Sequence, residues 1–192
     1  MLRFARRTGI MDADRTRRRQ IFAALSPRFG KLLPAAFLKN PGLAGVERIH
    51  PLTEGIHKPA WSNYALSITT MLKSQYHDQT YFNPDGTWWM HYSPKAGSLD
   101  IAVNAAMVRC MTDSEPLLVL KQIADKTSAS GSRYRLLGLG LVEHFDPQQH
   151  LFRIRGVPAD RFTDYLDRPL TDDLIETALR LEALAWISTD HL

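Results

Sequence analysis

The side chains best suited to chemistry concentrate in one stretch, residues 75–93 (QYHDQTYFNPDGTWWMHYS). It opens with a Tyr-His-Asp step, passes a turn signal at Asn-Pro-Asp-Gly, and continues as an aromatic run that alternates like a strand. Aromatic rings stack on the face of a nucleobase, and a carboxylate accepts a hydrogen bond from an exocyclic amine such as that of cytosine. The pattern predicts a hairpin that lines a pocket for a flat polar ring, with a flipped nucleobase as the first candidate.

Four residues take roles in this hypothesis. Tyr76 and Tyr92 form the walls of the pocket, Asp78 accepts a hydrogen bond from the base amine, and Ser93 reads the remaining edge of the base. The alternative is that both tyrosines are core residues with hydrogen-bonded hydroxyls, and spacing alone favours this alternative.

Other chemistries find less support in the sequence. The chain has no G-x-S-x-G nucleophile elbow, no Walker loop, and no histidine pair at the spacing of a metal site. Cys110 falls inside a mostly apolar helix, where a core role is expected. His57, His77 and His91 could still form a hydrolytic or metal site with Asp78 if the fold gathers them. Apart from that alternative, we expect no catalytic set, no metal and no cofactor.

The composition is ordinary for a globular protein, with 192 residues, 44% of them hydrophobic and 23% charged. No run of about 18 apolar residues predicts a membrane span, and the basic start lacks the apolar core of a secretory signal. A single cysteine excludes an internal disulfide and fits a reducing cytoplasm, where we expect the protein to be.

The positive charge is concentrated at the start of the chain. Residues 1–50 hold eleven Lys and Arg against three Asp and Glu, whereas residues 51–192 hold thirteen against seventeen. This asymmetry indicates an anionic partner such as nucleic acid, or else only a solvated helix face. Translation could also start at Met11, which would remove three of the arginines.

Before the hairpin, hydrophobic periodicity predicts a short helix over 12–25, with Asp12 or Asp14 near its positive N-terminus. Another helical turn or two is expected over 31–38. An edge segment is expected over 46–52, and β-branched residues predict a strand over 64–70.

After the hairpin, residues 100–111 form the clearest helix, and Asn104 within it is expected to hydrogen-bond a nearby loop backbone. Gly138 and Gly140 predict a bulge or a close backbone approach. Thr171 is expected to cap an amphipathic helix to about Ile187, which packs on the sheet or on a partner. Strands are predicted over 116–122, 134–144 and 151–155.

These elements predict an α+β fold with a curved, mostly antiparallel β-sheet or open barrel and peripheral helices. We expect a basic helical N-terminal arm over residues 1–45, a β-barrel domain over 46–158, and a C-terminal helical appendage over 159–192 that packs on the domain.

The middle of the chain resembles SRA-like (SET and RING associated, PUA-like) domains, which read modified cytosine. Divergent members occur in bacterial HNH-type modification-dependent restriction endonucleases. The matching features run from Gly55 to Arg155, and they are GIHKP (55–59), LSI (66–68), YHDQ (76–79), the DG turn (85–86), HYS (91–93), Asn104, PLLVLKQ (116–122) and YRLLGLGLVEHFD (134–146) before LFRIR.

The resemblance implies an SRA/PUA-like fold that flips a modified cytosine, such as 5-methylcytosine, into an aromatic pocket. Tyr76 and Tyr92 become the stacking walls, Asp78 the amine acceptor, and Ser93 the counterpart of a family threonine. Because Gln79 follows Asp78 where the family's acidic run is longer, either residue could face the base.

The expected partner is double-stranded DNA carrying modified cytosine, in a system linked to restriction. No nuclease motif follows the matching segment, so cleavage would belong to a partner nuclease or an atypical site. A further alternative is a protein-interaction subunit of a nuclease complex, in which the C-terminal helix docks to the nuclease and the pocket is merely structural. The residues expected to hold the DNA backbone are basic: Lys58, Lys73, Lys95, Arg15, Arg18 and Arg19.

Overall fold

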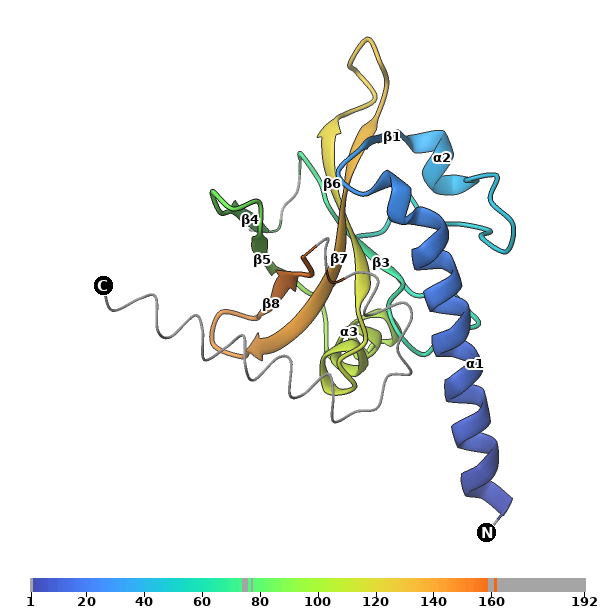
Figure 1. Cartoon of the computed structure of the whole chain (residues 1–192). Helices are drawn as coiled ribbons and strands as arrows, with labels where there is room; N and C mark the ends of the chain where they lie inside the picture. Colours follow the sequence, from blue (N-terminus) through green and yellow to red (C-terminus); the bar gives the residue numbers. More distant parts are fainter. Residues whose placement is uncertain (1, 74–75, 77, 159–160, 162–192) are drawn as a thin grey trace.

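The computed structural model describes residues 2–73, 76, 78–158 and 161, with side chains from residue 13 onward, and Figure 1 shows their arrangement. The helices are α1 (Leu2–Leu25), the 3-10 helix η1 (Ser26–Arg28), α2 (Ala35–Lys39) and α3 (Ala102–Thr112). The strands are β1 (Leu32–Pro34), β2 (Ile56–His57), β3 (Ser67–Thr70), β4 (Gln79–Phe82), β5 (Trp88–Tyr92), β6 (Leu117–Ala124), β7 (Arg133–Asp146) and β8 (Leu151–Gly156).

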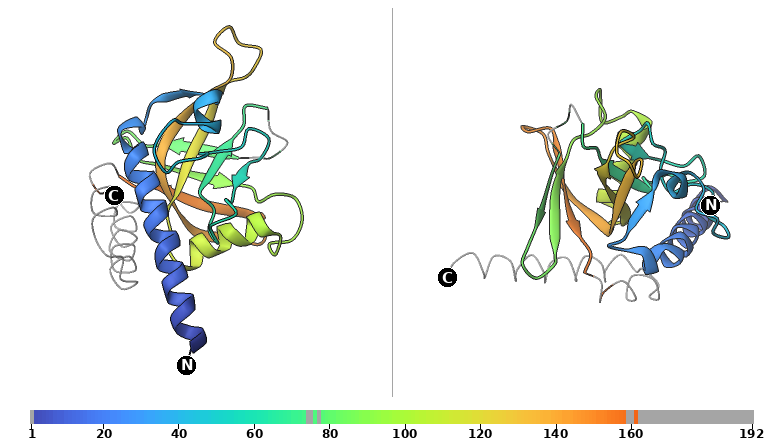
Figure 2. Two further views of the ribbon diagram at one scale, coloured as in Figure 1. Left: turned by 90° about the vertical axis from the view of Figure 1, so that its right-hand side faces the viewer. Right: turned by 90° about the horizontal axis from the view of Figure 1, so that it is seen from above.

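All the described strands belong to one sheet of eight, in the order β2-β3-β6-β7-β8-β5-β4, with β1 paired to β7 off this path. Only the β3–β6 pair is parallel, and the other pairs are antiparallel. The strands curve around an interior when seen from above (Figure 2, right), and β2 and β4 do not pair with each other, so the barrel stays open. The predicted α+β fold with a curved, mostly antiparallel sheet is confirmed.

The sheet buries apolar side chains on both faces. Along β6, Leu117 and Val119 pack in the cluster that includes α3, whereas Leu118 and Leu120 pack in the cluster that includes α1. Successive side chains of a strand point to opposite faces, so a strand covered on both faces must be apolar at nearly every position. The continuous apolar run of this strand follows from its central place.

The predicted hairpin is present as β4 and β5. In β5, Trp88, Met90 and Tyr92 are buried, while Trp89 and His91 are only partly buried and face the other way, as the alternation predicts. The bulge predicted near Gly138 is also present in β7. Val119 of β6 pairs with Gly138 but Leu120 pairs with Leu136, so the register shifts by one residue between them.

Gly140 shows the predicted close approach. A Cβ at this position would lie 2.8 Å from Ile154 Cγ2 and 2.9 Å from Val119 Cγ2. Only a residue without a side chain fits between these neighbours.

Two sequence expectations about the first 52 residues are wrong. Helix α1 begins at Leu2 rather than near residue 12, and Asp14 lies well inside it, buried, where its carboxylate accepts from Ser62 Oγ at 2.9 Å and Asn63 N at 2.9 Å. The placement of Asp14 is therefore explained by its hydrogen bonds to these two residues and not by the helix dipole. Residues 46–52 form no strand, because their only ladder contact is the isolated Leu43–Val46 bridge.

Other boundaries shift less. The expected helix over 31–38 is divided between β1 and α2, and the strand expected over 64–70 covers only Ser67–Thr70. The helix predicted around Thr171 and the appendage over 159–192 lie, apart from Arg161, outside the described residues. Within the described part of the chain, no helix combines the length and apolar character that crossing a bilayer requires.

Candidate nucleic-acid interface

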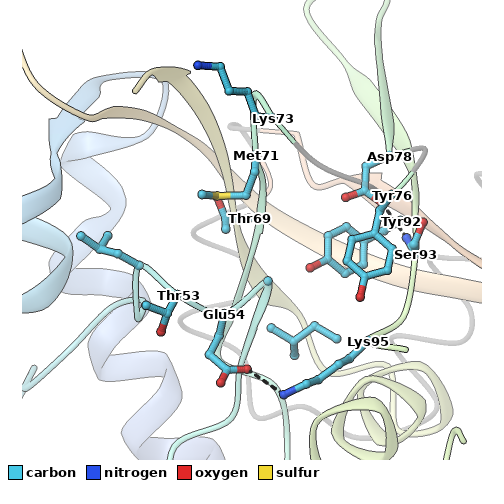
Figure 3. A pocket seen from close by; sticks show the side chains of 13 residues that line it. Thr53, Glu54, Thr69, Met71, Lys73, Tyr76, Asp78, Tyr92, Ser93 and Lys95 are labelled. Carbon is cyan, nitrogen blue, oxygen red and sulfur yellow. Dashed lines mark hydrogen bonds and ion pairs between the residues drawn. The ribbon is translucent and has the colours of Figure 1, made fainter. Parts of the chain in front are cut away.

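One cavity of about 550 Å³ opens between the start of β2, the end of β3 and the hairpin (Figure 3). The hairpin side of the cavity holds Tyr76, Asp78, Tyr92 and Ser93, so the four residues assigned to the pocket from the sequence lie around the same space. The remaining lining residues are Leu52, Thr53, Glu54, Gly55, Ile56, Thr69, Met71, Lys73 and Lys95.

Asp78 is held in place by the opposite strand. Its Oδ1 accepts a hydrogen bond from the backbone N–H of Ser93 at 2.7 Å, across the open end of the β4–β5 hairpin. A hydrogen bond from a backbone amide to a carboxylate is charge-assisted and fixes the carboxylate plane. Gln79 is placed differently, because it is exposed on β4, accepts from the Tyr81 hydroxyl, and does not line the cavity. Of the two residues, Asp78 is the one that lines the cavity.

The two tyrosines differ in their surroundings. The ring of Tyr92 is buried on β5, and its hydroxyl lies so close to the backbone of Gly55 that a Cβ there would stand 2.8 Å from it. Burial raises the pKa of Tyr92 well above its usual value, with Asp78 and Tyr76 adding to the effect, so its hydroxyl stays neutral. Tyr76 is only partly buried, and its hydroxyl accepts from Ala96 N at 3.3 Å.

The side chain of Asn104 in α3 anchors the loop that follows β5 by hydrogen bonds. The Asn104 side chain is fully buried, its Oδ1 accepts from Lys95 N at 2.9 Å, and its Nδ2 donates to Lys95 O at 2.8 Å and Ser98 O at 3.0 Å. This confirms the expectation that Asn104 bonds a nearby loop backbone. The same loop contributes the amide of Ser93 to Asp78 and the amide of Ala96 to Tyr76, so Asn104 positions the pocket without lining it.

The wall facing the hairpin combines the apolar Leu52, Ile56 and Met71 with several polar side chains. Glu54 Oε2 lies 3.3 Å from Lys95 Nζ, with both side chains about half exposed (Figure 3). Thr69 of β3 is buried, and its hydroxyl has no hydrogen-bond partner among the described residues. Behind this wall, the buried His50 donates from Nε2 to the backbone oxygen of Glu54 at 2.7 Å, which fixes the backbone that carries the carboxylate.

The lysines assigned to the DNA backbone lie at different distances from the cavity. Lys73 and Lys95 both line it, and Lys73 extends away from its centre to pair with Asp125 at 2.8 Å. Lys58 does not line the cavity, and its Nζ lies 3.5 Å from the Pro59 backbone oxygen.

The arginines of α1 require a correction. Arg18 is fully buried, and its guanidinium donates to Ala65 O at 2.9 Å and to Pro116 O. Its Nε also lies 3.9 Å from Glu115 Oε2, and Arg15 pairs with the same carboxylate at 2.5 Å. Arg18 therefore cannot contact a phosphate, because the apolar stripe of α1 carries it into the core.

Arg15 and Arg19 keep some exposed surface. A count of charges along the sequence could not distinguish these two from the buried Arg18, because all three stand in one basic run.

The histidines of the hydrolytic alternative are not gathered where they are described. His57 on β2 lies edge-on to His50 at 6.3 Å, whereas His91 faces the outer side of β5 with Tyr81 and Trp89. Among the residues that the structure describes, no three His, Cys, Asp or Glu side chains are grouped to hold a metal ion. His77 lies outside the described residues. Cys110 is buried, and burial raises the pKa of its thiol to about 11.

The residues on the cavity wall opposite the hairpin could not be predicted from the sequence. Thr53, Glu54 and Thr69 stand more than twenty residues before Asp78 or in a separate strand, and no local spacing connects them to the hairpin. Gly55 begins one of the quoted motifs, but its close approach to Tyr92 is visible only in the fold. The parallel pairing of β3 with β6 puts Thr69 in place, and long-range pairing of that kind leaves no local signal.

Comparison with known proteins gave matches only among solved structures, since no protein-family model and no curated protein matched. A KRYPTONITE complex with mCHH DNA, H3(1-15) peptide and SAH aligns with a TM-score of 0.47 at 16% identity, covering 77% of this chain and 42% of that chain. A KRYPTONITE complex with mCHG DNA and SAH gives 0.38 at 17%, covering 73% and 28%. SUVH9 gives 0.41 at 16%, covering 68% and 28%. All three of these alignments have TM-scores below 0.5, and this chain spans less than half the length of each of the three chains.

Proposed function

We propose that this chain is a DNA-binding protein of the SRA-like type, which reads a modified cytosine by holding the base, turned out of the duplex, in the cavity. The observation that carries the proposal is the meeting of Tyr76, Asp78, Tyr92 and Ser93 around one cavity of about 550 Å³. An aromatic wall, a carboxylate and a hydroxyl are the groups that a flipped cytosine requires.

We assign each residue of the cavity a role in this proposal. Tyr76, which is partly exposed, offers a ring face to the base, and stacking on an aromatic side chain is worth roughly 1–3 kcal/mol per base. Tyr92 lines the cavity with only 2% of its surface exposed, so we assign it a supporting place in the wall. Asp78, oriented by the Ser93 amide, accepts the hydrogen bond of the exocyclic amine. The Ser93 hydroxyl reads the adjacent edge. Lifting a base out of the stack costs a few kcal/mol, which these contacts offset.

The phosphates are held by basic residues around the opening. Lys73 and Lys95 lie at the cavity and are engaged in exposed ion pairs, which are weak and can be exchanged for phosphate contacts. Lys58 and the partly exposed Arg19 are further candidate phosphate contacts that do not line the cavity, whereas Arg15 is engaged with the buried Glu115. We propose that any cleavage of the bound DNA is performed by a partner nuclease.

The test compares matched duplexes that differ only in one cytosine, which is unmodified, methylated or hydroxymethylated, at several salt concentrations. We expect wild type to prefer modified duplexes at every salt concentration, while all affinities fall as salt rises. Asp78→Ala and Tyr76→Ala should remove the preference and leave a residual, salt-sensitive binding. Gln79→Ala is the matched control, because this neighbour is exposed and does not line the cavity, and it should keep the preference.

Equal binding of wild type to all the duplexes would overturn the proposal. An undiminished preference in both Asp78→Ala and Tyr76→Ala would do the same, since the cavity would then play no part in recognition.

A further inference from the structure

The outer face of the β4–β5 hairpin carries aromatic side chains that belong to neither hydrophobic core cluster. Tyr81 and Trp89 lie opposite each other across the hairpin, and their rings stack with centroids 3.9 Å apart. His91 meets the Trp89 ring edge-on at 5.1 Å. Tyr81 is 37% exposed, although aromatic side chains gain most of their stabilisation from burial. A contiguous aromatic face of this kind indicates a surface that another segment or molecule covers.

The same face continues over β8 with cationic side chains. Arg155 lies opposite Trp89, and the Arg153 guanidinium stands 5.1 Å from the centroid of the Trp89 ring. Both arginines pair with Glu143 of β7, at 3.4 Å from Arg153 Nε and 2.7 Å from Arg155 Nε. Asp146 of β7 accepts hydrogen bonds from two amides of its own turn. Two guanidinium groups beside one carboxylate favour an occupant that brings further acidic side chains.

The described helices pack on other parts of the sheet. α3 lies against β7 and β2, α2 lies against β1, and α1 lies across the molecule from the hairpin (Figure 2, right). β4 is the last strand of the sheet, so its outer edge pairs with no strand among the described residues. Within the described part of the chain, the outer face of the hairpin therefore lacks a covering helix.

The sequence after β8 supplies a segment that suits this face. β8 ends at Gly156, one residue after Arg155, and residues 162–192 follow outside the described part of the chain. They contain seven Asp and Glu against two Arg, so the segment is acidic where the face is cationic. Opposite charges of this kind select and orient a docking partner.

The helix expected over 171–187 also brings apolar side chains at helical spacing. Its apolar stripe, which Asp173 and Glu182 flank, consists of Leu174, Ala178, Leu181 and Ala185. Such a helix is about 25 Å long, whereas β8, β5 and β4 stand about 4.8 Å apart and present a face roughly 10–15 Å wide. The residues between Gly156 and Thr171 can extend up to about 45 Å, which is enough to bring the helix onto that face.

We propose that residues 162–192 dock on the outer face of β4, β5 and β8 of the same chain. The apolar stripe of the segment packs on Tyr81 and Trp89, and its acidic residues face Arg153 and Arg155. The segment forms a second layer behind the hairpin and shields an edge strand from pairing with other chains. This docking does not depend on the reading of modified cytosine proposed above.

The test is a paramagnetic relaxation measurement on the full chain. A nitroxide label is attached to the cysteine of Glu182→Cys, while the native Cys110 is buried and stays unlabelled. The amide NMR signals of β4, β5 and β8 should be broadened more strongly than those of α3 and β2. Leu181→Asp with the same label should remove this pattern, because it places a charge in the apolar stripe.

Two neighbouring exposed aromatic residues of β4 provide matched variants. Tyr81 lies on the proposed docking face, whereas Phe82, which is 56% exposed, points to the other face of the strand. Tyr81→Ala should weaken docking several-fold through the loss of one aromatic contact, and the broadening should decrease with it. Phe82→Ala should leave the broadening unchanged, and equal effects of the two variants would overturn the proposal.

Other occupants of the face give other results. Broadening that is strongest away from β4, β5 and β8, or equally weak along the whole chain, would overturn the proposal. A mixture of labelled chains with unlabelled, isotope-enriched chains tests for a second copy. Broadening of β4 and β5 in that mixture as strong as within one chain would assign the face to the second copy and overturn the proposal as well. Failure to read modified cytosine with the broadening pattern intact would overturn only the proposed function.

Discussion

Replacing Asn104 by alanine tests whether the loop that carries the pocket is held from α3. The side chain is fully buried and makes three hydrogen bonds to the loop after β5: from Lys95 N to Oδ1 at 2.9 Å, and from Nδ2 to Lys95 O at 2.8 Å and to Ser98 O at 3.0 Å. Alanine removes all three and leaves three backbone groups without their partner.

The expected loss follows from these contacts. A buried hydrogen bond contributes roughly 1 kcal/mol net, and a backbone group left unsatisfied costs roughly 1–3 kcal/mol. We therefore expect Asn104→Ala to lower the free energy of unfolding by about 3 kcal/mol, a large part of the 5–15 kcal/mol typical of a domain. DNA binding should weaken as well, because Ser93 and Ala96 on this loop donate to Asp78 and Tyr76.

Urea denaturation followed by circular dichroism measures the change, with Asn83→Ala as the matched control. Asn83 makes one side-chain hydrogen bond, to Thr87 Oγ1 at 2.8 Å, in the turn of the hairpin, so its loss should cost about 1 kcal/mol or less. An Asn104→Ala variant no less stable than Asn83→Ala would refute the assignment of Asn104 as the anchor of the loop.

Three further predictions concern stability. Arg18→Met should lower the free energy of unfolding by about 3 kcal/mol, because it leaves the buried backbone oxygens of Ala65 and Pro116 without this donor and removes one of the cationic partners of Glu115. Arg17→Met on the exposed side of α1 should change it by less than about 1 kcal/mol, and equal effects would contradict the burial of Arg18. Gly156→Ala should cost about 1–3 kcal/mol by forcing a methyl group against the Trp88 ring, and an unchanged melting temperature would refute this packing. Burial lowers the pKa of His50 to about 3, so on acidification the unfolded state takes up a proton on this histidine before the folded state does. The free energy of unfolding should therefore fall as pH drops from 6.5 toward 3, by roughly 1.4 kcal/mol per pH unit. His50→Gln should flatten this slope, and an unchanged slope would contradict the assignment to His50.

The hairpin and the central strands could be predicted because their signals are local. The alternation of Trp88–Tyr92, the turn before it and the apolar run of β6 each depend on neighbours along the chain, and all appear where expected. Asn104 was also predictable, since a polar amide among small apolar residues must find backbone partners nearby.

The rest depends on contacts between distant parts of the chain. Arg18 stands in a basic run that suggests a surface, yet it reaches Ala65 and Pro116, which are far away in sequence. Thr69 and Glu54 join the cavity only because the sheet pairs β2 with β3 and β3 with β6. Residue types and spacing therefore predicted one wall of the cavity and not the wall that faces it.

Reading a modified cytosine in this way requires the base to leave the duplex and enter the cavity. The fluorescence of a 2-aminopurine placed next to the modified cytosine reports this, because it rises when its stacked neighbour is turned out. With wild type we predict a saturable rise on the modified duplex, a small change on the unmodified duplex, and no rise with Asp78→Ala at protein concentrations that saturate binding. Preferential binding of the modified duplex by wild type without any rise in fluorescence would contradict the account.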